Sequence, residues 1–224
     1  MENIKEFEQL IYKRISCKLC HESNRMCHFE KFFDETDEKL LGLWDPLHFG
    51  NLLCSEILII GQDYSNVDYL EKAKRSREQL YIQEEKSPTN KKIRRYLNKV
   101  EWKEKPIYFT NAVLCIKFGT MSAKIDRKWV ENCSEEFLKP LIAEYLTNLR
   151  TIITLGEGAL SAIKYLDLNT INKPFKNVVA KPQLVKIDQK PYKLIPMYHP
   201  ACHLDVVRKS TGKEPEEIWR SIKL

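Results

Sequence analysis

Short apolar runs that alternate with helical patterns constrain the fold of this chain more than any other feature. Each run is too short for a helix and contains β-branched residues, as strands buried in a parallel sheet do. The four runs span residues 56–60, 107–110, 151–155 and 193–198. Because helical patterns separate them, the sequence predicts an α/β protein, a three-layer α/β/α sandwich with a central four-stranded parallel sheet.

The helical patterns lie before and between these runs. They span residues 1–15, 68–86, 125–149 and 157–166, together with a basic helix that includes Ile93 and Tyr96. Thr89 or Asn90 is expected to cap the basic helix, and Pro140 is expected to kink or interrupt the long helix. The chain shows no internal repeat or long linker, so a single domain over residues 1–224 is expected.

Composition excludes several classes of protein. The 43% hydrophobic and 30% charged residues are typical of a globular chain. No apolar run approaches the length needed to cross a bilayer, and the charged first fifteen residues do not resemble a secretion signal. We therefore expect a protein of the cytoplasm or nucleoid. The net charge of +6 suits a polyanionic partner, although a solvated surface explains it equally well.

Seven cysteines in a reducing compartment are unlikely to form a disulfide framework, and their odd number argues the same way. Cys17 and Cys20 form a CxxC motif, and Cys115 and Cys133 lie downstream. Their spacing is compatible with a closed zinc site and with an iron–sulfur cluster, and does not distinguish them. The remaining cysteines are expected to be small buried side chains: Cys27, Cys54 and Cys202.

Polar side chains follow three of the predicted strands. Gln62 and Asp63 come after the first strand, Asn111 after the second and His199 after the fourth. Each has an ordinary structural reading as a turn or strand-end residue. Together, however, they would meet at one edge of the sheet, because ligand sites in such folds lie beyond the carboxyl ends of the strands. An acid, an amide and an imidazole there suggest acid–base chemistry and oxyanion stabilisation.

These strand ends resemble the uracil-DNA glycosylase superfamily in order and spacing. The similar segments are Gly61-Gln62-Asp63, Thr110-Asn111-Ala112-Val113-Leu114-Cys115, Leu155-Gly156 and His199-Pro200-Ala201. The first two resemble the first family, whereas the cysteines and His-Pro-Ala resemble the iron–sulfur fourth and fifth families. The resemblance covers roughly residues 10–208. It implies a DNA glycosylase of base excision repair that hydrolyses the N-glycosidic bond of uracil, or a related deaminated base, in DNA.

The resemblance also implies roles for the strand-end residues. Asp63 would orient water and stabilise the cationic sugar, and His199 would donate a hydrogen bond to uracil O2. Asn111 would read the uracil edge by donating to O4 and accepting from N3. Gly61 and Gln62 would complete the substrate site, Gln62 through its backbone N–H.

The chain departs from the family pattern after Asp63. Where the first family continues with Pro-Tyr, whose ring excludes thymine, this sequence has Tyr64-Ser65, which implies a wider substrate range. The Arg-Pro-Phe-Val-Gly segment of the fourth family is absent. Tyr64, Tyr69 and Tyr81 are therefore the candidates to stack on the base.

The resemblance implies contacts with DNA and a metal centre. Leu204 would wedge into the duplex, with His203 as its competitor and a buried core leucine as the ordinary reading. Seven basic residues are expected to meet phosphates, unless they only solvate the surface: Lys91, Lys92, Arg94, Arg95, Lys117, Lys124 and Arg208. Four cysteines match the family's ligands for a structural 4Fe-4S cluster, with zinc as the alternative: Cys17, Cys20, Cys115 and Cys133.

Two other readings remain open at this point. A non-catalytic iron–sulfur module of the same fold would bind nucleic acid without turnover. A zinc-stabilised protein unrelated to DNA would leave the ordered match of motifs to coincidence. The leading hypothesis is a monomeric uracil-DNA glycosylase whose partner is DNA and not a membrane.

Overall fold

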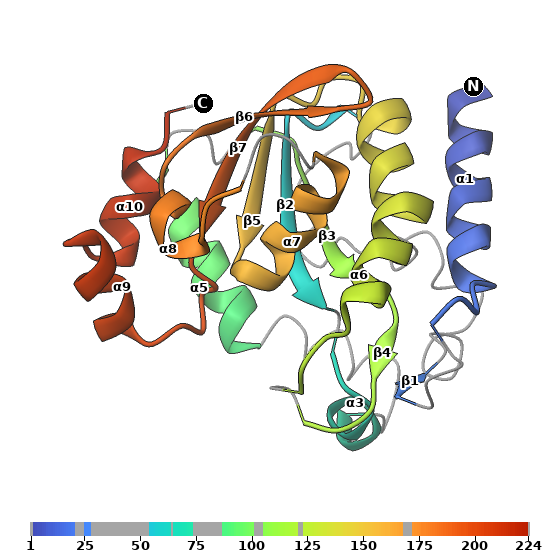
Figure 1. Ribbon diagram of the computed structural model, residues 1–224, viewed down its shortest axis with the longest axis horizontal. Coiled ribbons are helices and arrows are strands. Elements are labelled where there is room, and N and C mark those ends of the chain that lie inside the picture. The colour runs from blue at the N-terminus through green and yellow to red at the C-terminus, as the bar shows by residue number, and fades with distance from the viewer. Residues whose placement is uncertain are drawn as a thin grey trace.

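The computed structural model describes residues 2–20, 25–27, 54–63, 65–73, 87–100, 105–120, 123–167 and 172–223. Its centre is a five-stranded sheet with the strand order β3-β2-β5-β7-β6 (Figure 1). The strands are β2 (Ile57–Asp63), β3 (Ile107–Val113), β5 (Thr151–Leu155), β6 (Gln183–Ile187) and β7 (Lys190–Met197). The strands β2, β3, β5 and β7 are parallel, which confirms the predicted parallel sheet.

The strand β6 was not predicted. It pairs antiparallel with β7 as an edge strand, so the described sheet has five strands and not four. The two strands are joined by a tight turn in which Asp188 and Gln189 have φ values of 50° and 63°. Hairpin turns with positive φ at both positions usually carry Asn-Gly or Asp-Gly. Asp188-Gln189 lacks the glycine, which removes the sequence signal for this hairpin.

Two strands run further than the sequence predicted. Gly61 was expected to end the first strand and Asn111 the second, but both residues lie inside strands and pair with each other. The pairing continues to Asp63 and Val113. Backbone hydrogen bonds to the neighbouring strand, which no local pattern reports, hold these last residues extended. Gln62, Asp63 and Asn111 are therefore part of the sheet and not of loops.

Helices cover both faces of the sheet, as the three-layer prediction requires (Figure 1). One face packs against α6 (Arg127–Cys133) and α7 (Glu157–Leu166). The other packs against α5 (Pro88–Leu97), α9 (Leu204–Thr211) and α10 (Pro215–Ser221). The helix α1 (Glu2–Ile15) lies on the outer side of the long helix that begins with α6 (Figure 1). The remaining described elements are α3 (Val67–Ala73), α8 (Phe175–Val178) and a small antiparallel pair, β1 (Met26–Cys27) and β4 (Ile116–Lys117).

The long helix passes Pro140 without a break. Two π-helical segments, η5 (Ser134–Leu138) and η6 (Leu141–Tyr145), lie on either side of this proline. A proline has no N–H to donate, and in a regular α-helix its ring clashes with the carbonyl four residues earlier. The wider π turns accommodate the ring, so the irregularity predicted at Pro140 takes the form of π-helical turns and not of a break in the chain of helical turns.

Three local expectations are corrected by the structure. Neither Thr89 nor Asn90 caps the basic helix; Ser87 does, since its Oγ accepts from the Asn90 N–H at 3.1 Å. Cys54 is exposed and Cys202 is half-buried, so neither is the fully buried residue that was expected.

The side chain of Cys27 and residues 74–86 lie outside the described part. Among the described helices, none has the length and apolar character needed to cross a membrane.

Candidate active site

Three polar side chains reach the same edge of the sheet from different strands. Asp63 ends β2, Asn111 lies in the last half of β3, and His199 follows β7 by two residues. Asn111 lies on the face covered by α5, because it continues the odd-numbered residues Ile107 and Phe109 that pack there. The charge of Asp63 acts on the His199 imidazole. The structure therefore places the predicted acid, amide and imidazole at one edge of the sheet, with the acid close enough to the imidazole to act on its charge.

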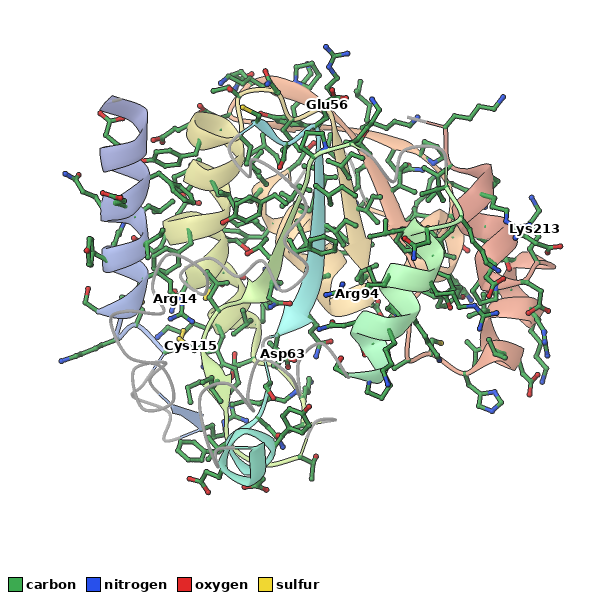
Figure 2. The ribbon with its side chains drawn as sticks, turned by 180° about the vertical axis from the view of Figure 1, so that it is seen from behind. Arg14, Glu56, Asp63, Arg94, Cys115 and Lys213 are labelled. Atoms are coloured by element: carbon green, nitrogen blue, oxygen red, sulfur yellow. The ribbon has the colours of Figure 1, made fainter. Side chains whose placement is uncertain are left out.

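The Asp63 carboxylate is held through one of its two oxygens. Nζ of Lys117 lies 2.5 Å from Oδ2, and Nε2 of Gln62 lies 3.5 Å from the same atom. The side chain of Asp63 is 10% exposed and that of Lys117 only 1%. Neither of these two contacts uses Oδ1. Among the described residues, Oδ1 of Asp63 thus remains open to another partner; Figure 2 marks Asp63 at the end of β2.

Asn111 carries a buried amide group with an open hydrogen-bond donor. The residue is 7% exposed, and its Nδ2 has no hydrogen-bond partner among the described residues. Its Oδ1 lies so close to Gly61 that a Cβ there would be 2.3 Å away. A buried amide donor without a partner is destabilising, so a native protein usually keeps one for a reason. An acceptor atom of a ligand would satisfy this donor.

The His199 ring is held in one tautomer. Its Nδ1 accepts a hydrogen bond from the Ala201 N–H at 3.1 Å, which leaves the proton of the neutral ring on Nε2. Burial lowers the pKa of His199; the Asp63 carboxylate opposes this shift and the Lys92 ammonium adds to it. Lys92 also donates from Nζ to the Pro200 carbonyl at 2.9 Å, which fixes the loop that carries the ring. The ring is therefore a neutral donor through Nε2.

The lowered pKa of His199 predicts a pH dependence of stability. Above the ordinary histidine pKa of about 6.5, the ring is neutral in both the folded and the unfolded state and contributes no pH dependence. As the pH falls below that value, the unfolded chain takes up a proton that the folded chain resists, so stability is lost. Urea unfolding from about pH 7.5 to about pH 5 should show a smaller loss in His199→Ala than in the wild type. Equal losses would contradict the assignment.

The family model described as the uracil DNA glycosylase superfamily matches residues 47–223. The chain belongs to this superfamily. A comparison with curated proteins finds no significant match. The region that matches the uracil DNA glycosylase superfamily contains the whole central sheet and all three strand-end residues. It includes Cys115 and Cys133 but not the CxxC motif at Cys17 and Cys20.

The four predicted cysteine ligands of this superfamily member are neighbours in space. The thiols of Cys20 and Cys133 share a hydrogen bond, which lowers the pKa of Cys20 to about 7, and Cys115 acts electrostatically on Cys133. Cys17 lies close enough to Cys20 to interact with it, although burial is the main reason that its pKa is raised. Arg14 of α1 donates to the Leu114 carbonyl (Figure 2). The C-terminal end of α1 is thereby tied to the segment that carries Cys115.

This arrangement does not form a complete ligand cage. No group of three or more His, Cys, Asp or Glu side chains in the described ranges has the geometry to hold a metal ion. The donor set is nevertheless of the right chemical kind, since thiolates are the ligands of both iron–sulfur clusters and structural zinc. The four cysteines thus have the ligand chemistry that an iron–sulfur cluster or a zinc ion needs, and they lie near one another in the structure.

Three of the predicted DNA contacts, His203, Leu204 and Arg208, lie in α9 or directly before it. His203 caps this helix, and its Nδ1 accepts from the Asp205 N–H. Leu204 follows it and is 41% exposed, so it is not the buried core leucine of the ordinary reading. Arg208 is exposed and forms an ion pair with Glu214. Tyr64, the predicted substrate contact, lies outside the described residues.

The sequence-based prediction that Lys117 faces DNA phosphates is wrong. As one of several basic residues it was expected to face DNA phosphates, yet it is buried and paired with Asp63. Its place beside the site depends on β4 folding back against β1 and the end of β2, which is a long-range contact. No local signal in the sequence reports this contact. The Ala201 N–H, which sets the tautomer of His199, was also missed, although it is only two residues from the ring that it binds.

Proposed function

We propose that this protein is a DNA glycosylase that hydrolyses the N-glycosidic bond of uracil, or of a related deaminated base, in DNA. The observation that carries the proposal is the buried Nδ2 of Asn111, which has no hydrogen-bond partner in the described part of the chain and lies at the sheet edge that also holds Asp63 and His199. Membership of the superfamily supports the glycosylase class. The pattern of donors and acceptors supports the choice of base.

The reaction breaks the bond between C1′ and N1, and the bonding electron pair leaves with the base. Positive charge develops on the sugar, and the Asp63 carboxylate stabilises it and orients the water that attacks C1′. Negative charge develops on the base, and Nε2–H of His199 donates to its O2. The water oxygen forms the new bond to C1′, and its proton balances the charge of the released base.

Asn111 supports selection of uracil over cytosine. Uracil offers an acceptor at O4 and a donor at N3, which match the Nδ2 donor and the Oδ1 acceptor of the amide. Cytosine reverses both groups, so each contact would become a donor facing a donor or an acceptor facing an acceptor. A mismatch of buried polar groups discriminates strongly between such substrates.

The base has to leave the helical stack before it reaches this edge, which costs a few kcal/mol. The exposed Leu204 at the start of α9 is positioned to fill the gap that the base leaves. His203 is the second candidate for this wedge, and Arg208 is a candidate phosphate contact. Tyr64 would line the substrate site. We assign the activity to base excision repair in the cytoplasm or nucleoid, by a monomer.

We further propose a 4Fe-4S cluster held by Cys17, Cys20, Cys115 and Cys133, with zinc as the alternative. The pairwise contacts of these thiols support it. The group would act structurally: it would tie α1 to the segment after β3 and to the end of α6. Asn132 donates from Nδ2 to Sγ of Cys20 at 3.7 Å, the kind of contact that stabilises a thiolate.

Replacing Cys115 by serine tests the metal centre. Metal binding free energy contributes to folding, so we expect loss of the brown colour near 400 nm and a melting temperature lowered by at least about 5 °C. Absorbance, metal analysis and thermal unfolding of anaerobically purified protein provide the measurement. The matched control is Cys54→Ser, an exposed cysteine that should change neither. A colourless, zinc-loaded wild type would replace the cluster by zinc, and a normal melting curve for Cys115→Ser would contradict its role as a ligand.

The function is tested by incubating the protein with single-stranded oligonucleotides that carry one uracil, hypoxanthine or other deaminated base. Alkali then cleaves the strand wherever a base has been removed. We expect cleavage at uracil and none at cytosine. Binding of these oligonucleotides without cleavage of any of them would favour the alternative, a non-catalytic nucleic-acid-binding module of the same fold.

A further inference from the structure

A buried lysine that the proposed reaction does not use lies against the carboxylate at the end of β2. Lys117 is 1% exposed, and its Nζ is 2.5 Å from Oδ2 of Asp63. Burying an ammonium carries a large desolvation penalty, and apolar replacements of buried ion pairs are often neutral or stabilising. Stability alone is therefore a weak explanation for a charged residue at this position.

The backbone around Lys117 is held on two sides. Lys117 pairs with Met26 of β1 and forms a bridge with Asn66, just after the end of β2. Its neighbour Phe118 donates its N–H to the Arg25 carbonyl at 2.8 Å. The base of the lysine side chain is thus fixed relative to Asp63. A fixed donor of this kind restricts the orientation of the group that it binds.

The hydrogen bonds that Asp63 accepts from the described residues all reach one of its two oxygens. Lys117 and Gln62 both approach Oδ2, and the proposed reaction needs the other oxygen to orient water. A carboxylate held through one oxygen cannot rotate freely, so the direction of Oδ1 is set by the bond to Lys117. An ammonium also reduces the negative charge available to the sugar cation. The benefit of Lys117 must therefore come from orientation, since its charge opposes this part of the reaction.

We propose that Lys117 is a positioning residue of the glycosylase reaction: its ammonium fixes Oδ2 of Asp63 so that Oδ1 faces the attacking water. The inference rests on the proposed function. In this account Lys117 touches neither the base nor the sugar, and it acts only through Asp63. A structural ion pair would instead affect stability and leave the chemical step unchanged in folded protein.

Single-turnover rates of uracil release at saturating enzyme test the proposal. We expect Lys117→Met to lower the rate by about 100-fold, the loss typical of a misplaced reacting group, while affinity for the oligonucleotide changes less than about threefold. Lys117→Arg keeps a cationic donor at Oδ2 and should retain a rate within about tenfold of the wild type. An unchanged or faster rate in Lys117→Met would overturn the proposal.

A double-mutant cycle with Asp63→Asn separates positioning from a general structural effect. If Lys117 acts through Asp63 alone, adding Lys117→Met to Asp63→Asn should change the rate by less than about threefold, because residues that act as a unit are not additive. A further loss equal to that of Lys117→Met alone would contradict the proposal. If Lys117→Met does not fold, Lys117→Gln, which keeps an N–H donor, takes its place. A rate of uracil release lowered by at least about tenfold in this variant supports the proposal. An unchanged rate overturns it.

The control is a second lysine–carboxylate pair, which lies beside the other end of β2. Nζ of Lys105 lies 2.7 Å from Oε2 of Glu56 at the opposite end of β2 and β3. Lys105→Met should leave the rate of uracil release unchanged. Wild-type protein that releases no base would refute the proposed function itself. Wild-type activity with an equally active Lys117→Met variant would refute only the role of Lys117.

Discussion

Replacing Asp63 by asparagine is expected to lower the single-turnover rate of uracil release by about 1,000-fold, within the range for a group that positions water and handles its proton. Asparagine keeps the size of the side chain and removes its charge. Oδ1 would no longer stabilise the sugar cation, and the amide is a poor acceptor for the proton of the attacking water. The loss should therefore appear in the chemical step and not in binding to DNA.

This substitution also leaves the Lys117 ammonium buried without its counter-ion. Breaking a buried pair in this way destabilises a protein by up to about 3–5 kcal/mol, so the rate has to be measured at a temperature where circular dichroism shows folded protein. The matched control is Glu56→Gln, which removes a carboxylate from the opposite end of β2. We expect Glu56→Gln to keep the wild-type rate. A wild-type rate in folded Asp63→Asn would remove Asp63 from the reaction.

Replacing His199 by alanine should lower the rate of uracil release by about 100- to 1,000-fold, the effect of removing one donor to a developing anion. The tautomer set by the Ala201 N–H leaves Nε2–H to donate to O2 of the departing base. Without this donor the negative charge on uracil is not stabilised. The effect should therefore depend on how readily the base carries that charge.

A substrate with a better leaving group makes this test specific. In 5-fluorouracil the fluorine withdraws electrons, so the released anion needs less help from the protein. We expect the loss caused by His199→Ala to be clearly smaller with 5-fluorouracil than with uracil. His203→Ala, a substitution at the exposed cap of α9, should weaken DNA binding and leave the saturated rate near that of the wild type. Equal losses on both bases would contradict a role for His199 at the leaving group.

The sequence predicted the elements that local patterns report. The β-branched runs 57–60 and 151–155 form strands because they are buried on both faces, and such burial leaves a continuous apolar pattern. The rule that ligand sites lie beyond the carboxyl ends of parallel strands then placed Asp63, Asn111 and His199 at one edge. These three residues could therefore be recognised as candidates for the site from the sequence alone, without knowledge of contacts between distant segments.

The remaining features depend on contacts between distant segments. Lys117 looks like a surface residue in the sequence, and only the pairing of β4 with β1 turns it toward Asp63. The extension of β2 through Gly61 depends on its pairing with Asn111 in the neighbouring strand. The antiparallel β6 has the alternating burial of an edge strand, but its turn lacks the usual glycine. Local propensity does not report interactions of this kind.

The central claim is that Asp63, Asn111 and His199 act on one base that has left the stack. Mass spectrometry of the wild-type protein incubated with a single-stranded oligonucleotide carrying one uracil tests it most directly. We predict free uracil together with an intact strand that has lost only that base, and neither product from the matched cytosine oligonucleotide. An oligonucleotide that is bound by the protein and recovered with its uracil still attached would contradict the account.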